Sequence, residues 1–320
     1  MFTAKDDLFH EPATSDHFLT ETNWWNFCIP ERNLDGQLYI YFRPNLGTTY
    51  AGVYVWDDFC RHFSDALYFD TWLYLPMPKA DPDGYRLENG IHVKVLEPLR
   101  KYQLTYEPPN GTSFHLVFEG LTDALDYNEG RSLDEKDVLI QNHMEQVGRM
   151  TGDLTLYGEH LRVDCITHRD HSWNAVRREE RHFLPNFGWQ AGHFGEEFCF
   201  QLWFWCGEPV MTDLVVGFVY ENRQPHRIVW ARRETQWDET GVEPRTMHLE
   251  FRDANGKVYR INGRALNMFP WTAHLNWVCY AGLVEWDLDG RIGYGDVQDG
   301  RDLDWVRRKK LEVRRRTITR

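Results

Sequence analysis

The chain has 320 residues, of which 42% are hydrophobic and 27% are charged. This composition is typical of a soluble globular protein and excludes an intrinsically disordered chain. The net charge of −13 argues against nucleic-acid binding, and no apolar run is long enough for a membrane-spanning helix. The first residues lack the basic and apolar regions of a secretory signal, so we expect a cytoplasmic protein.

Most of the chain has the pattern of short β-strands that end at Gly, Pro, Asn or Asp. Asn255-Gly256 and Asp289-Gly290 are two-residue turn signals of β-hairpins. We therefore predict an all-β protein of antiparallel barrels or sandwiches. The predicted strands cover residues 36–44, 49–56, 67–75, 91–96, 102–107, 113–119, 152–157, 161–167, 198–206, 214–220, 226–237, 246–252, 257–262 and 276–287.

Few segments have helical periodicity. Residues 16–27 and 302–313 are predicted as short helices, although the second is equally compatible with a strand. Residues 185–195 are rich in Gly and Asn and are predicted as a loop at a domain junction. This predicts two β units, residues 1–185 and 186–320. Residues 121–137 carry six acids and are predicted as a surface excursion.

The end of the chain is strongly basic. Residues 306–320 contain eight basic side chains and one acid, a net of +7. Such a segment either pairs with the acidic body of the protein, which we favour, or binds an anionic partner.

The cysteines and motifs exclude several classes of site. The six cysteines form no Cys-x-x-Cys pair, which predicts reduced thiols in the core. No Gly-x-Ser-x-Gly, Gly-x-Gly-x-x-Gly or Walker sequence occurs, so we expect neither a serine hydrolase nor a nucleotide cofactor. The 14 Trp, 15 Tyr and 19 Phe residues serve mainly as core, but a subset can line a cavity for a hydrophobic small molecule.

Ionisable side chains are concentrated in two segments. The first, residues 141–149, carries His143 and Glu145, and the second, residues 167–174, has the sequence THRDHSWN. The intervening residues predict a hairpin that turns around Gly158, which places both segments close together on adjacent strands.

Period-two alternation sorts the second segment. In a strand, Arg169, His171 and Trp173 share one face, while His168, Asp170 and Ser172 share the other. We consider that Asp170 orients His171 or Arg169 while His171 transfers a proton. A metal site built from His143, His168, Asp170 and His171 is the less favoured interpretation, because Arg169 would repel a cation. A buried polar network without catalytic function is a further alternative.

Several segments resemble a known superfamily. Residues 21–27 (ETNWWNF), 41–45, 143–149, 168–173 (HRDHSW) and 289–295 are similar to bacterial proteins that are distantly related to the hydroxyneurosporene synthase (carotenoid 1,2-hydratase) superfamily. The resemblance implies two lipocalin-like β units packed together and chemistry on isoprenoid-like molecules. The superfamily's His-x-Trp matches His171 and Trp173, whereas its Tyr-x-Asp has no counterpart in residues 196–203.

These observations favour an acid–base enzyme, a hydratase/dehydratase or a cyclase/isomerase, acting on an isoprenoid-like or polyene substrate. Either Asp170 or Glu145 is the expected acid and His171 its partner, while Arg169 and His143 orient them. The expected aromatic walls are Trp173, Trp24, Trp25, Trp203 and Trp205. No metal or other cofactor is expected.

Two alternatives remain open. One is a lipocalin-like carrier of a small lipophilic ligand. The other is a structural or partner-binding protein that docks through its basic C-terminal segment. A homo-oligomer is compatible with each of these interpretations.

Overall fold

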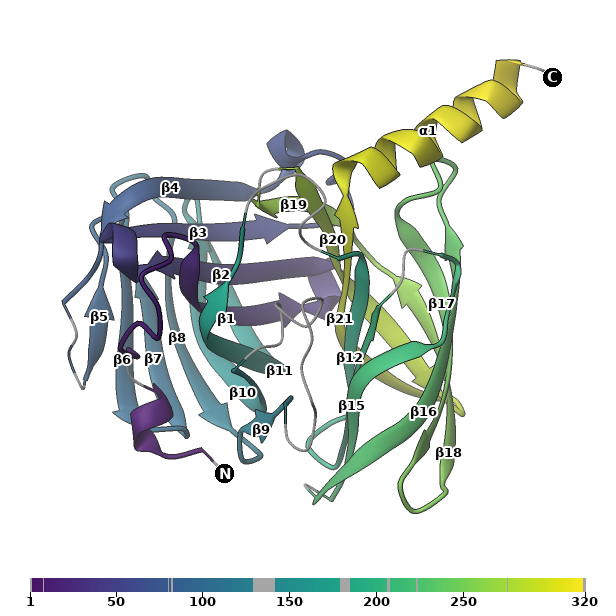
Figure 1. The fold of residues 1–320 in the computed structure, drawn as a ribbon, viewed down its shortest axis with the longest axis horizontal. Coiled ribbons are helices and arrows are strands. Elements are labelled where there is room, and N and C mark those ends of the chain that lie inside the picture. Colours follow the sequence, from purple (N-terminus) through teal and green to yellow (C-terminus); the bar gives the residue numbers. More distant parts are fainter. Residues whose placement is uncertain are drawn as a thin grey trace. The chain divides into compact units, whose positions relative to one another are not determined.

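The protein consists of two compact β units (Figure 1). The computed structural model describes residues 2–7, 9–79, 81, 83–128, 142–178, 185–205, 208–222, 224–274 and 276–318, with only the backbone of residues 273, 317 and 318. Unit 1 comprises Met1–Trp56 and Ala66–Arg178, and unit 2 comprises Asp57–Asp65 and Glu179–Arg320. The predicted all-β class with two units is confirmed, while the boundary placed after residue 185 stays a prediction.

Unit 1 is an antiparallel sheet of eleven strands in the order β4-β3-β2-β1-β11-β10-β8-β7-β6-β5, with β9 paired to β10. The sheet curls, since Phe42 on β2 and Tyr85 on β5 are far apart in this order but their ring centroids lie 5.4 Å apart. The strands are β1 (Leu19–Ile29), β2 (Leu34–Arg43), β3 (Thr48–Trp56), β4 (Tyr68–Pro76), β5 (Gly84–Arg86), β6 (Ile91–Glu97), β7 (Lys101–Tyr106), β8 (Ser113–Gly120), β9 (Leu125–Asp126), β10 (His143–Leu156) and β11 (Glu159–Val176).

Unit 2 is a closed barrel. Its strands follow the order β16-β15-β13-β12-β21-β20-β18-β17, and β17 pairs with β16 to close the ring (Figure 1, green to yellow). Closure removes sheet edges, and apolar side chains fill the interior. The strands are β12 (Phe187–His193), β13 (Phe198–Trp205), β14 (Val210–Met211), β15 (Asp213–Glu221), β16 (Gln224–Trp237), β17 (Pro244–Asp253), β18 (Val258–Ala265), β19 (Phe269–His274), β20 (Trp277–Leu288) and β21 (Arg291–Asp302).

In the part of the chain that the structure describes, helical structure is short except toward the C-terminal end. The 3-10 helices are η1 (Ala4–Asp7), η2 (Pro30–Arg32), η3 (Pro44–Leu46) and η4 (Phe63–Asp65), and the α-helix is α1 (Leu303–Ile318). The Asp302 carboxylate accepts hydrogen bonds from the backbone N–H groups of Asp304 and Trp305, which caps the start of α1. The helix predicted over residues 302–313 is therefore confirmed.

Two predictions of local structure are wrong. Residues 16–27 are predicted as a helix, but β1 occupies most of this range because it pairs with both β2 and β11. Residues 185–195 are predicted as a loop, but most of them form β12. Its Gly192 packs against Phe200 and Trp286, so close that a Cβ would lie 2.3 Å from the Phe200 ring. Here glycine makes room for aromatic side chains instead of forming a turn.

Other predictions concern the turns, thiols and charged segments. The Asn255-Gly256 and Asp289-Gly290 turns join β17 to β18 and β20 to β21, as predicted. Five of the six cysteines are buried thiols, while Cys206 lies outside the described residues. Much of the acidic segment 121–137 also lies outside them. Within the described part of the chain, no helix has the length and apolar character needed to cross a bilayer.

Candidate functional site

The β10–β11 hairpin brings together the two polar segments that the sequence singles out. Antiparallel pairing sets Met144 opposite His171, Glu145 opposite Asp170, and Gln146 opposite Arg169. The predicted proximity of residues 143–149 and 168–173 is therefore confirmed, and the segments are directly paired rather than only adjacent at their ends.

Alternation along β11 divides these side chains between two faces of the sheet. We call the side that carries Arg169, His171 and Trp173 the concave face, because the sheet curls toward it, and the opposite side the convex face. Asp170 lies on the convex face. Directly paired residues share a face, which places Trp25 with Arg169 and Trp24 with Asp170.

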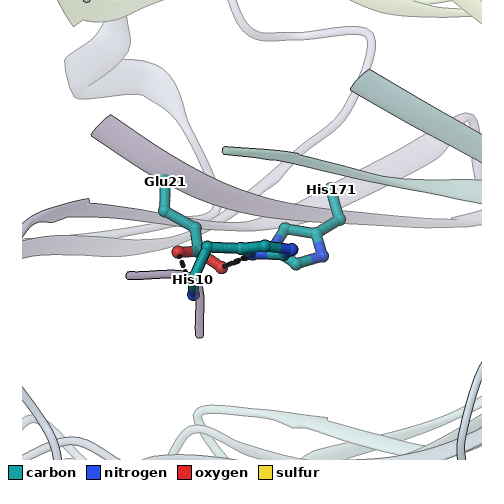
Figure 2. A group of neighbouring side chains, drawn as sticks. All are labelled: His10, Glu21 and His171. Carbon is teal, nitrogen blue, oxygen red and sulfur yellow. Dashed lines mark hydrogen bonds and ion pairs between the residues drawn. The ribbon is translucent and has the colours of Figure 1, made fainter. Parts of the chain in front are cut away.

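On the concave face, the Glu21 carboxylate joins two histidines (Figure 2). Glu21 Oε1 lies 2.8 Å from His171 Nε2 and 3.1 Å from His10 Nδ1, and the His10 backbone N–H donates to Oε2. Burial raises the pKa of Glu21, but the hydrogen bonds from His10 and His171 outweigh it and lower the pKa below its ordinary value. The indole of Trp173 stacks on His10 with ring centroids 4.3 Å apart.

Arg169, also on the concave face, contacts protein partners through Nε and Nη2. Its Nε donates to Gln146 Oε1 at 2.9 Å, and its Nη2 contacts Asp7 Oδ1 at 3.1 Å and the Tyr102 hydroxyl at 2.6 Å. The guanidinium also lies over the rings of Tyr102 and Trp25, 4.2 Å and 5.3 Å from their centroids. This is the buried ionic network that the sequence allows as an alternative to a catalytic role.

The convex face gathers the predicted acids. His143 Nε2 lies 3.2 Å from Glu145 Oε1, and ligand-type atoms of His143, Glu145 and Asp170 lie within 4.8 Å of one another. His143 and Glu145 are buried, whereas Asp170 is half-buried and keeps some exposed surface. We call these three residues the acid cluster.

The environment of the acid cluster favours neutral forms. Burial raises the pKa of Asp170 to about 7, although the guanidinium groups of Arg177 and Arg169 act in the opposite direction. Burial also lowers the pKa of His143 to about 3, assisted by the charge of Arg177. Near neutral pH the imidazole of His143 is therefore uncharged, and the Asp170 carboxyl keeps its proton to a higher pH than an ordinary aspartate does.

The predicted site residues thus separate into three groups. His143, Glu145, Asp170 and Trp24 lie on the convex face, where Trp24 donates to Gln37 Oε1 at 2.9 Å and its ring lies 4.8 Å from that of His168. Trp25, Arg169, His171 and Trp173 lie on the concave face. Trp203 and Trp205 belong to β13 of unit 2, where their side chains are buried and 5.9 Å apart.

One predicted relation within the site is wrong. Asp170 does not orient His171 or Arg169, because consecutive residues of a strand point to opposite faces. The carboxylates that contact them are those of Glu21 and Asp7. Sequence reasoning missed both acids. Glu21 begins the segment ETNWWNF, which is a signal for it, whereas nothing local in residues 2–10 indicates that Asp7 and His10 reach β11.

Among the described residues, two groups have the composition to hold a metal ion. In each of the sets His10–Glu21–His171 and His143–Glu145–Asp170, the ligand-type atoms lie within 4.8 Å of one another. In the first set, however, three N–H donors already satisfy the carboxylate of Glu21. Hydrogen bonding therefore accounts for that arrangement without a cation.

A comparison with known protein families shows to which family the chain belongs. A family described as a domain of unknown function, DUF7064, matches residues 3–305. The chain belongs to this family. By sequence, no curated protein matches it.

Solved structures share the fold at low sequence identity. A Nitrosomonas europaea protein designated AttH has a TM-score of 0.59 and 11% identity, over 88% of this chain and 92% of that chain. CghA has a TM-score of 0.54 and 13% identity, over 88% of each chain. Kievitone hydratase from Nectria haematococca has a TM-score of 0.50 and 13% identity, also over 88% of each chain. The distant resemblance to the hydratase superfamily is thus confirmed at the level of fold.

Proposed function

We propose that this protein is an acid–base enzyme, a hydratase/dehydratase or an isomerase/cyclase, and that the acid cluster on the convex face of unit 1 carries the chemistry. The observation that supports this most is the close grouping of Asp170, Glu145 and His143, and burial raises the pKa of the Asp170 carboxyl in this group. A general acid is most effective when its pKa lies close to the working pH.

The residues of the acid cluster have complementary roles in this proposal. The Asp170 carboxyl donates its proton to one carbon of a substrate double bond, which leaves a cation on the other carbon. In a hydration, water forms a bond to that carbon and releases a proton to Glu145, and this proton then returns to Asp170. His143, hydrogen-bonded to Glu145, orients the carboxylate. An isomerase or cyclase would lose a proton from carbon instead.

The substrate we propose is apolar, of the isoprenoid or polyene type. Trp24, directly opposite Asp170 on β1, would face the developing cation, which aromatic rings stabilise. The fold shared with kievitone hydratase supports hydration as the reaction to test first. We assign no catalytic role to the predicted residues on the concave face, because they lie on the opposite side of the sheet from Asp170. These residues are Trp25, Arg169, His171 and Trp173. Trp203 and Trp205 stay predictions as pocket walls, and a non-catalytic carrier stays the alternative.

Substrate conversion in heavy water tests the proposal. The protein is incubated with a panel of isoprenoid alkenes and polyenes, and mass spectrometry detects added water or exchanged deuterium. We expect Asp170→Asn to reduce conversion by about 100-fold or more. The matched control is Asp164→Asn, which removes an exposed carboxylate from the same strand and should retain full conversion.

Two outcomes would contradict the proposal. Equal turnover by the wild type and by Asp170→Asn would remove Asp170 from the chemistry. Loss of turnover in His171→Ala alone would move the chemistry to the concave face. A titration of the ¹³C-labelled Asp170 carboxyl needs no substrate, and its expected midpoint is about 7.

A further inference from the structure

We propose that the concave face of unit 1 is a binding site for an apolar carboxylate, and that a segment of the chain itself occupies this site. The segment, which we call the strap, comprises residues 2–7 and 9–17. Asp7 takes the place of the ligand's carboxylate, and the rings of Phe9 and His10 take the place of its apolar body. This inference does not depend on the acid–base function proposed for the convex face.

The carboxylate of Asp7 is held by a site with three donors. Arg169 Nη2 contacts Asp7 Oδ1 at 3.1 Å, and the hydroxyl of Tyr102 and the backbone N–H of Leu99 both donate to Oδ2. The side chains of Arg169 and Asp7 are each only 2% exposed. Gln146 fixes the guanidinium from the other side. A guanidinium, a hydroxyl and an amide that converge in a buried position form a receptor for carboxylates.

The apolar part of the strap lies against aromatic rings. The ring of Phe9 lies 4.8 Å from that of Phe42 and 5.5 Å from that of Tyr85. His10 stacks on Trp173 with an interplanar angle of 3°. An aryl or alkyl chain attached to a carboxylate would find the same contacts.

The strap leaves part of the site unused. A cavity of about 20 Å³, large enough for a water molecule, is lined by Asp7, Phe9, Trp25, Tyr85 and Tyr102 among others. The indole N–H of Trp25 and the hydroxyl of Tyr85 are buried there without a hydrogen-bond partner in the described part of the chain. Buried donors are normally paired, so these two groups indicate an acceptor that the strap does not supply.

Charge defines which ligand can displace the strap. Among the described residues, Asp7 is the carboxylate that forms an ion pair with Arg169. Withdrawal of Asp7 alone would leave a buried guanidinium unpaired, which is strongly unfavourable. A ligand must therefore bring its own carboxylate, and a neutral molecule of the same length would not compensate Arg169.

Calorimetric titration with hexanoate tests the inference on the full chain. Asp7→Ala removes the internal competitor, so we expect it to bind hexanoate at least about tenfold more tightly than the wild type. Hexanol, which has the same chain length but no carboxylate, should show no such gain. The matched control is Asp6→Ala, because Asp6 bonds to Thr3 on the exposed side. Equal hexanoate affinity in Asp7→Ala and Asp6→Ala, or equal binding of hexanol, would overturn the proposal.

Hydrogen exchange on the wild type gives a second test, which does not require a stable variant. Hexanoate should increase exchange of the backbone amide of His10, which donates to Glu21, by about tenfold or more. The amide of Leu99 should remain protected, because the ligand replaces Asp7 as its acceptor. Unchanged exchange in the strap at saturating hexanoate would contradict displacement.

Discussion

Both units bury arginine and aspartate side chains, but they use them differently. In unit 2 the Asp299 carboxylate accepts from Arg233 through both oxygens, at 2.7 Å and 3.0 Å, and from Arg301 at 2.8 Å. All three side chains are fully buried. In unit 1 burial raises the pKa of Asp170 to about 7, while the charges of Arg177 and Arg169, which lower it, do not restore its ordinary value.

This difference follows from how completely each carboxylate is paired. A buried charge is stable only when its partners replace the water that it has lost. Asp299 has a bidentate partner in Arg233 and a second guanidinium in Arg301, and it stays a structural ion. For Asp170, burial is the dominant influence on the pKa. The completeness of pairing therefore distinguishes the structural ion Asp299 from Asp170, the acid of the proposed function.

The largest effect is expected where pairing is complete. Asp299→Asn retains the shape of the side chain but leaves two buried guanidinium groups without their shared carboxylate. We expect it to lower the free energy of unfolding by about 3–5 kcal/mol. Urea unfolding measures this loss, and the exposed Asp213→Asn in β15 should change stability by less than about 0.5 kcal/mol. If Asp299→Asn changed the free energy of unfolding no more than Asp213→Asn does, the structural role assigned to Asp299 would be contradicted.

Asp170→Asn is expected to have a smaller effect on the free energy of unfolding, and to stabilise the protein rather than destabilise it. Its pKa is about 7 in the folded protein against an ordinary 3.8, so between these values the folded state holds a proton that the unfolded state has lost. The free energy of unfolding therefore decreases as pH rises through this window. In the wild type this decrease is on the order of 2 kcal/mol, a value reduced for the partial exposure of Asp170. Asp170→Asn should abolish the decrease, because asparagine does not titrate. Parallel pH profiles of the wild type and the variant would contradict this.

The smallest effect is expected from a fully formed but exposed pair on the same hairpin. Arg149 Nε and Nη2 contact the two oxygens of Asp164 at 2.7 Å and 2.9 Å, with side chains 45% and 49% exposed. Water competes for these groups, so a double-mutant cycle with Arg149→Ala and Asp164→Ala should give a coupling of about 0.2–1 kcal/mol. The coupling should decrease at high salt. A coupling energy above this range that does not change with salt would show that the bidentate geometry of this pair, rather than its burial, sets the strength of the interaction.

Much of the fold could be predicted because β-patterns are local. Alternating runs and the Asn255-Gly256 and Asp289-Gly290 turns indicate strands and hairpins from adjacent residues alone. The helix over α1 has a local cap in Asp302. Local patterning wrongly predicts a helix over much of β1, because the conformation of this strand depends on pairing with β2 and with β11, which lies more than a hundred residues away.

The all-β class, the β10–β11 hairpin and the alternation that assigns Asp170 and His171 to opposite faces can be derived from the sequence alone. Each of these follows from the backbone geometry of neighbouring residues. The partner of each side chain is set by the folded unit: Glu21 contacts both His10 and His171, and Asp7 contacts Arg169. Such contacts depend on how a sheet curls and what packs on it, and therefore on the free energy of the whole unit rather than of any segment.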